Sequence, residues 1–186
     1  MLFRKTLHAD KLHIGCGDSI LDGWTNIDLK GGLGVDLKAD VRRGLPFDSG
    51  TVHYIYAEHF LEHLAQAQGF AFLQECHRVL KPSGAVLRLS TPNLDWVWKT
   101  HYHLPAAADE KRRMAHRLNQ AFRDWGHQYL YNDVILTDAL RMAGFASSRF
   151  FPYAESDVEE LKNLERHETY ADSPNLPHVI IAQAYK

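Results

Sequence analysis

The chain has 186 residues, of which 45% are hydrophobic and 24% charged, and its formal net charge at pH 7 is −2. A chain of this size and composition can bury one hydrophobic core, so we expect a single domain over residues 1–186. Basic residues cluster at 42–43 and 111–113 but form no longer run, so no extended basic face is expected and nucleic acid is excluded as an expected partner.

Only two cysteines are present, Cys16 and Cys76, which excludes a disulfide scaffold and is typical of a reducing compartment. Charged residues interrupt residues 1–15 before an apolar targeting segment can form, and no apolar run approaches the length of a membrane span. We therefore expect a cytoplasmic protein with no membrane contact. The sequence leaves the oligomeric state open.

The first part of the chain alternates short apolar runs with turn-forming residues. Residues 12–15 form an apolar run that ends in the sequence GCG, and residues 24–29 form a second run. Residues 35–40 and the aromatic and β-branched run 52–57 are two further strand candidates. The Gly- and Pro-containing residues 44–50 between them indicate a loop.

A helix and a fifth strand are predicted next. The apolar residues between 61 and 80 fall mostly at helical spacing, and the sequence KPSG that follows is typical of a helix end. Residues 85–90 predict a strand, which the sequence TPN is expected to end. Residues 94–131 then interrupt the alternation, because aromatic and histidine residues surround a charged helical stretch at about 106–123. We interpret residues 94–131 as an inserted lid.

The last part of the chain returns to regular elements. Asn132 is a predicted N-cap, residues 134–143 an amphipathic helix, and Gly144 the glycine that follows its end. Residues 150–154 and 179–185 are the last two predicted strands. Strands that alternate with helices in one domain indicate an open α/β sheet with helices on both faces.

Five motifs carry a family resemblance: LHIGCG (12–17), DGWTNIDL (22–29), DVRRGLPFDSGTVHYIYAEHFLEHL (40–64), ECHRVLKPSGAVLRLSTPNL (75–94) and LRMAGF (140–145). In this order they resemble the class I S-adenosylmethionine-dependent methyltransferases, and more narrowly a small bacterial branch in which GCG, GW-x-N-x-D, HxLEH and RVLKPGG recur. The resemblance covers nearly the whole chain. It implies a Rossmann-like, doubly wound, mostly parallel sheet and S-adenosyl-L-methionine as cofactor.

The resemblance also implies a cofactor site at the carboxyl ends of the central strands. Gly15 and Gly17 would let the backbone approach the cofactor, and Asp28 would accept hydrogen bonds from both ribose hydroxyls. Asp40 would face the adenine amino group, although it is also compatible with a loop cap, as the glycines are with ordinary turns. The residues assigned to this site are His13, Gly15, Cys16, Gly17, Asp28, Asp40, Val41 and Glu58.

Two features depart from the family pattern. His13 stands where family members commonly carry an acidic residue that helps hold the amino group of the methionine tail. The interval from Gly15 to Asp28 is shorter than the roughly 20 residues expected when a full helix intervenes, so the helix amides that normally face this tail would be fewer. These departures leave a second interpretation open, a cofactor-binding or degenerate relative without catalysis.

The stretch AEHFLEHL (57–64) reads H-x-x-E-H, the signature of one class of zinc metallopeptidases. Such a site needs its ligands on one helix, whereas here the motif directly follows a predicted strand, with the helix expected to begin near Phe60 or Leu61. His59 and His63 then need not share a helical face. We therefore expect no metal, and a zinc hydrolase is the least favoured function.

The favoured function is a methyltransferase that acts on a small-molecule acceptor. Because the donor is already activated, the protein has mainly to align the acceptor and exclude water, while an oxygen acceptor additionally needs a base. His59 follows the strand nearest the expected methyl group and is the leading candidate, with His127 and His103 as second choices. Four aromatic residues either line an acceptor pocket or pack the insertion against the sheet: Trp96, Trp98, Trp125 and Tyr129.

Overall fold

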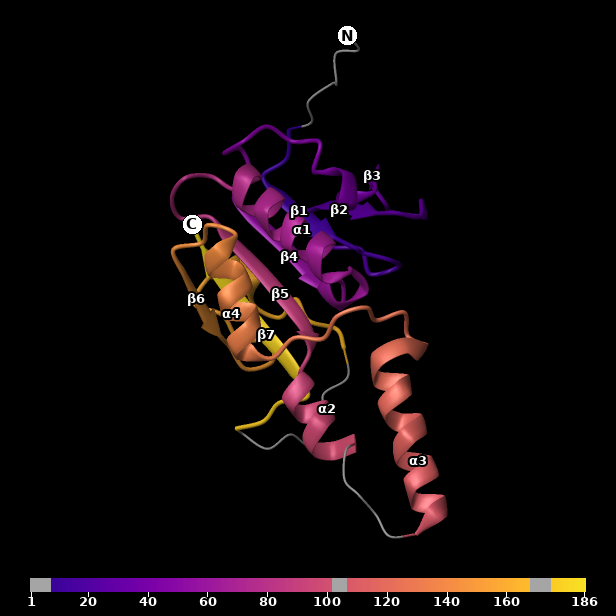
Figure 1. Ribbon diagram of the computed structural model, residues 1–186. Helices are drawn as coiled ribbons and strands as arrows, with labels where there is room; N and C mark the ends of the chain where they lie inside the picture. The colour runs from indigo at the N-terminus through magenta and orange to yellow at the C-terminus, as the bar shows by residue number, and fades with distance from the viewer. Residues whose placement is uncertain (1–7, 102–106, 168–174) are drawn as a thin grey trace.

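The computed structural model describes residues 8–101, 107–167 and 175–186, which form a seven-stranded sheet with helices (Figure 1). The strand order is β3-β2-β1-β4-β5-β7-β6. The first five strands are parallel, and β7 is antiparallel to both of its neighbours. The expected class, a Rossmann-like and mostly parallel α/β sheet, is confirmed.

Most strands lie near their predicted positions. The exception is β6, which starts three residues earlier than expected, because this polar edge strand offers no apolar alternation to mark it. β5 also continues past Ser90 to Pro92, which pairs with Val179 as the last residue of the strand. The strands are β1 (Lys11–Ile14), β2 (Thr25–Asp28), β3 (Leu37–Lys38), β4 (Tyr54–Glu58), β5 (Val86–Pro92), β6 (Ser147–Phe150) and β7 (Val179–Tyr185).

Four α-helices are described, and none is long and apolar enough to cross a lipid bilayer. The first begins later than predicted, because Leu61–His63 form a separate 3-10 turn and Leu64 is extended. Asn132 caps the last helix as predicted, its side chain accepting a hydrogen bond from the Ile135 amide at 3.0 Å. The helices are α1 (Gln66–Val79), α2 (Leu94–His101), α3 (Ala108–Asn119) and α4 (Asp133–Met142).

The two faces of the sheet are covered differently. α1 and α4 lie on one face, over the main hydrophobic core (Figure 1). Helices were also expected on the other face, but the described residues there come from irregular chain and a 3-10 turn (Glu159–Leu161), which bury Trp24 and Leu161. The connection from β1 to β2 is too short to hold a helix, as the short interval between Gly15 and Asp28 indicated.

A buried ion pair fastens the segment after β6 to this second face. Arg88 on β5 donates to Glu165 at 2.6 Å, and both side chains are fully buried. Gln183 on β7 accepts a second hydrogen bond from the Arg88 guanidinium at 2.7 Å. Separating a buried pair leaves an uncompensated charge, so the two side chains stay together. Because the chain is held at Glu165, the next residues, Arg166 and His167, also lie at this end of the sheet.

The interpreted lid, residues 94–131, extends beyond the carboxyl end of β5 (Figure 1). Three of its buried apolar residues, Val97, Ala121 and Leu130, form a small cluster of their own, whereas Tyr131 is part of the main core and Tyr129 packs against it. α3 runs on into a π-helical turn, Gln120–Asp124. Residues 102–106, with the candidate base His103, lie outside the described part of the chain.

Candidate functional site: two cavities that share His59

A cavity of about 300 Å³ opens at the carboxyl ends of β1 and β2. Four residues that the resemblance assigned to the cofactor line it, namely Gly15, Asp28, Asp40 and Val41. Residues remote in the chain therefore meet at one place, as the resemblance implied. The full lining is Gly15, Ile27, Asp28, Leu29, Ala39, Asp40, Val41, Arg42, His59, Phe60, His63 and Leu64.

Asp28 is the last residue of β2, and backbone amides hold its carboxylate at this cavity. Its two oxygens accept hydrogen bonds from the amides of Gly17 at 3.0 Å and Lys30 at 2.7 Å. Gly15 turns the chain with φ +67°, and a Cβ there would clash with the ring of Phe60. The glycine is thus required for the close packing of the first turn against the residues that follow β4.

Asp40 is a loop cap at the wall of the smaller cavity, and its contact with adenine stays a prediction. It lines the cavity and also caps the 3-10 turn Val41–Arg43 by accepting from the Arg42 amide at 3.1 Å. The Arg42 guanidinium donates to both carboxylate oxygens, at 2.7 and 2.8 Å, and these hydrogen bonds lower the pKa of Asp40. Arg42 itself lines the cavity and was not among the residues expected there.

His13, Cys16, Gly17 and Glu58 do not line this cavity. His13 is 3% exposed, donates a hydrogen bond from Nδ1 to Asn26 Oδ1 at 3.1 Å, and stacks on the ring of Tyr56. Burial lowers the pKa of His13. The structure therefore places its side chain in the core beside the glycine turn, and the proposed contact of His13 with the cofactor stays a prediction.

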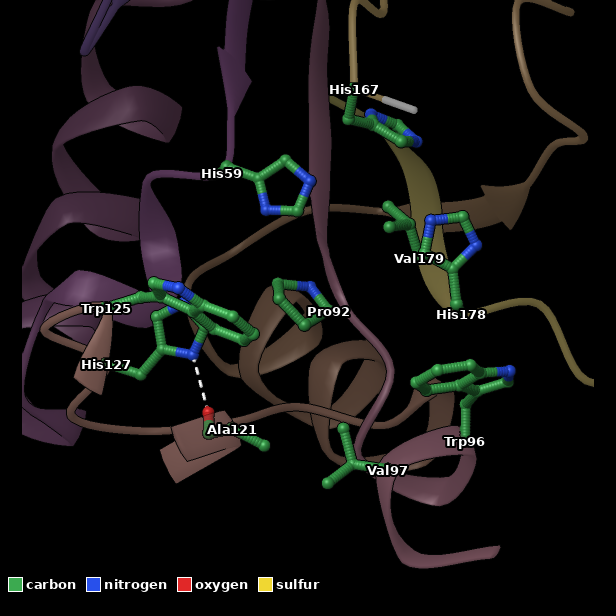
Figure 2. A pocket seen from close by; sticks show the side chains of 10 residues that line it. All are labelled: His59, Pro92, Trp96, Val97, Ala121, Trp125, His127, His167, His178 and Val179. Atoms are coloured by element: carbon green, nitrogen blue, oxygen red, sulfur yellow. Dashed lines mark hydrogen bonds between the residues drawn. The ribbon is translucent and has the colours of Figure 1, made fainter. Parts of the chain in front are cut away.

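A second cavity, of about 490 Å³, lies between β5, the lid and the segment that leads into β7 (Figure 2). Its lining contains imidazole, indole and aliphatic groups but no Lys, Arg, Asp or Glu among the described residues. Two of these residues, His167 and His178, were not expected at the site. The lining is His59, Pro92, Trp96, Val97, Ala121, Trp125, His127, His167, His178 and Val179.

His59 lines both cavities. Its backbone has φ 45°, a left-handed conformation that costs a residue other than glycine about 1–2 kcal/mol. The amide of His59 donates to the Ser90 carbonyl at 3.0 Å, which ties this turn to β5. Strained backbone of this kind persists only where the surrounding structure imposes it, and it is concentrated at functional sites.

Glu62 orients the His59 ring. Its side chain is fully buried; one carboxylate oxygen lies 3.0 Å from His59 Nδ1, and the other accepts from the Thr91 hydroxyl at 3.1 Å. Because a carboxylate can only accept, Nδ1 carries the proton and Nε2 is left for another partner. Burial alone would lower the pKa of His59, but Glu62 and, less strongly, Glu58 outweigh it and raise that pKa.

The H-x-x-E-H residues do not form the helix of a zinc peptidase, since His59 lies in a turn and Leu61–His63 in a 3-10 turn. Ligand atoms of Glu62, His63 and His127 do lie within 4.8 Å of one another. A tetrahedral zinc ion with bonds of about 2.0–2.1 Å holds its ligands roughly 3.4 Å apart. His127 Nδ1 donates to the Ala121 carbonyl at 2.7 Å (Figure 2), and the Glu62 oxygens already accept from His59 and Thr91.

Glu58 is bound by the segment after β6. Its Oε1 accepts from His167 Nδ1 at 2.7 Å and from the amides of Arg166 at 2.8 Å and His167 at 3.0 Å. Burial alone would raise the pKa of Glu58, but these hydrogen bonds outweigh it and hold the pKa at about 2. Glu58 is thereby ionised, and it positions His167 in the wall of the larger cavity.

A family model described as a methyltransferase domain matches residues 26–87. An S-adenosylmethionine-dependent methyltransferase from Mesorhizobium loti has a similar structure, with a TM-score of 0.61 and 15% identity over 96% of this chain and 91% of that chain. A Thermotoga maritima protein described as a possible histamine N-methyltransferase gives 0.59 and 12%, over 98% and 84%. No curated protein sequence gives a significant match.

The smaller cavity fits S-adenosylmethionine, because Asp28 presents a carboxylate at the end of β2 and Gly15 leaves the adjoining backbone clear. A phosphoethanolamine N-methyltransferase from Haemonchus contortus, solved in complex with this cofactor, gives a TM-score of 0.50 and 14% identity, over 80% of this chain and 36% of that chain. Identities this low show a shared fold only. Taken together, the matched residues 26–87 contain a methyltransferase domain, and the strand order gives the chain the fold of the class I S-adenosylmethionine-dependent methyltransferases.

Proposed function

We propose that the chain methylates the oxygen of a neutral, planar small molecule bound in the larger cavity, and that His59 accepts the proton. The observation that carries this proposal is the position of His59, which lines both cavities. A side chain at that boundary is near both the methyl donor and the methyl acceptor.

S-adenosylmethionine supplies a methyl group already activated on a sulfonium, with Asp28 and Asp40 to hold its adenosine. The acceptor hydroxyl gives its proton to Nε2 of His59, and its oxygen forms a bond to the methyl carbon as the carbon–sulfur bond breaks. Glu62 stabilises the imidazolium through Nδ1, at 3.0 Å. Glu62 is therefore a positioning residue for His59.

The lining of the larger cavity supports a neutral acceptor. Trp96 and Trp125 offer flat apolar surfaces, and Val97 and Val179 close the walls. None of the described lining residues is a Lys or Arg that could pair with a phosphate or carboxylate. His127, His167 and His178 can hydrogen-bond polar groups of an acceptor.

An amine is the rival acceptor. The Thermotoga maritima neighbour is described as a possible histamine N-methyltransferase. Tryptophan faces attract cations, and the carboxylates of Glu58 and Glu62 lie behind the histidines of the cavity. The two acceptors differ in the atom that carries the new methyl group, so the product decides between them.

The test supplies S-adenosylmethionine with matched sets of phenols, amines of the same size and phosphorylated phenols, and locates the new methyl group by mass spectrometry and NMR. We expect O-methylation of neutral phenols. His59→Gln should lower kcat by about 10²–10⁴-fold, the usual contribution of a positioned base, and His116→Gln on exposed α3 is the matched control. N-methylated product, or full activity of His59→Gln, would contradict the proposal.

A further inference from the structure

The amino-acid tail of the cofactor carries an α-carboxylate and an α-ammonium, and both charges need partners when bound. Arg42 lines the smaller cavity, but its guanidinium is already paired with the Asp40 carboxylate. The connection from β1 to β2 contains no helix whose free amides could face the tail. A second segment that brings both charges to this end of the sheet would complete the site.

Arg166 reaches this end of the sheet from the segment after β6. Its amide donates to Glu58 at the end of β4, and its Nη2 donates to the Ile20 carbonyl, in the turn after β1, at 3.2 Å. The residue therefore links the end of β4 to the connection between β1 and β2. Its side chain is exposed and forms no ion pair with any other described residue.

Glu58 supplies the opposite charge at the same place. The three hydrogen bonds from Arg166 and His167 all end on Oε1, so Oε2 accepts none of them. The charges of Arg166 and Glu58 both act on the pKa of His13, two residues before Gly15, although burial is the largest influence there. Because Ile14 pairs with Ala57 in the ladder of β1 and β4, Glu58 lies beside Gly15, and Arg166 is held to Glu58 and to the Ile20 carbonyl.

We propose that Arg166 and Glu58 bind the amino-acid tail of the cofactor, the guanidinium taking the α-carboxylate and Glu58 Oε2 the α-ammonium. Arginine matches a carboxylate with two parallel hydrogen bonds, which makes it suited to this role. The pair replaces both family features that this chain lacks, the acidic residue at position 13 and the helix after β1. The segment is held in register by the buried pair of Arg88 and Glu165.

The test is calorimetry on the full chain with two ligands, S-adenosylhomocysteine and 5′-methylthioadenosine, which lacks the amino-acid tail. Arg166→Gln should weaken S-adenosylhomocysteine binding at least about tenfold, the loss expected for a charge-assisted hydrogen bond, and leave 5′-methylthioadenosine within about twofold. Arg166→Lys should fall between, because it keeps the charge without the planar fork.

Arg141→Gln is the matched control, an exposed arginine on α4 paired with Asp138. Unchanged binding of S-adenosylhomocysteine to Arg166→Gln would overturn the proposal. Equal losses for both ligands would also overturn it, since Arg166 would then only hold the loop. The inference concerns how the cofactor is bound and does not depend on the acceptor. The affinity of Arg166→Gln therefore tests this inference, whereas the product of methyl transfer tests the proposed function.

Discussion

The two cavities that meet at His59 are built in different ways. The smaller one is lined by residues between Gly15 and Leu64, most of them at strand ends and the turns that follow. The larger one collects side chains from five separate parts of the chain, from His59 to Val179. The smaller cavity is formed by strand ends and the turns that follow them. The larger cavity exists only when the lid and the segment before β7 are packed in place.

The difference separates what the family shares from what distinguishes this chain. We propose that Asp28 and the glycine turn hold the cofactor, and the contacts of Asp28 with backbone amides do not depend on the lid. Trp96, Trp125 and the histidines of the larger cavity come from the lid and from the segment before β7. We infer that acceptor choice lies in these later parts, so changes in the two cavities should affect different steps.

Asp28→Asn should have the largest effect on the cofactor side. If Asp28 accepts both ribose hydroxyls, losing its charge weakens two charge-assisted hydrogen bonds, each worth roughly 1.5–3 kcal/mol. We expect S-adenosylmethionine affinity, measured by calorimetry, to fall at least about tenfold. Asp138→Asn on exposed α4 is the control. If the affinity equals that of the unaltered chain, the assignment of Asp28 to the cofactor site is wrong.

Glu62→Gln should change the pKa of His59, the residue shared by the two cavities. His59 must be neutral to accept a proton, so methyl transfer should be lost as pH falls through its raised pKa. Removing the Glu62 charge lowers that pKa, so the acid limb of the kcat profile should move to lower pH while the plateau falls. Glu58 and the ring of His167 also face His59 and are unchanged by this variant. If the acid limb of the profile does not move, His59 is not the group that accepts the proton.

Amide exchange in the lid should slow more on ligand binding than amide exchange around the smaller cavity does. The lid's small apolar cluster around Val97, Ala121 and Leu130 is separate from the main core, so the lid can open as far as Leu130 while Tyr131 stays packed in that core. We propose that residues 94–131 close over bound cofactor, and we expect slower amide exchange there when S-adenosylhomocysteine is added. Equal exchange in both states would make the segment a fixed wall of the larger cavity.

Metal removal should have no effect. We propose that Glu62, His63 and His127 hold no metal ion, because the Glu62 oxygens already have partners in His59 and Thr91. Elemental analysis should then find no stoichiometric zinc, and a chelator should leave the unfolding temperature unchanged. About one zinc per chain, lost on His63→Ala, would reverse this assignment.

The sequence predicted the parts of the molecule whose signals are local. The GCG turn, the Asp28 strand end and the Asn132 cap each depend on neighbouring residues, and the structure has them in place. β6 was misplaced because a polar edge strand is defined by its ladder to β7 and not by its own residues. Helices were expected on the second face, where the chain uses irregular segments.

The larger cavity could be predicted only in part for the same reason. His59 and His127 were identified from their places after a strand and within an aromatic insertion. His167 and His178 carry no local signal, since only the contact of His167 with Glu58 and the pairing of β7 with β5 bring them to the site. Likewise, the Thr91 hydroxyl reaches Glu62 only because β5 continues beyond its predicted end.

The central claim is that His59 separates a cofactor cavity from an acceptor cavity, and a crystal structure with S-adenosylhomocysteine tests it most directly. We predict electron density for the adenosine against Asp28, with the sulfur on the side of His59 that faces the larger cavity. Density for the cofactor product within the Trp96 and Trp125 cavity, or remote from Asp28, would contradict the account.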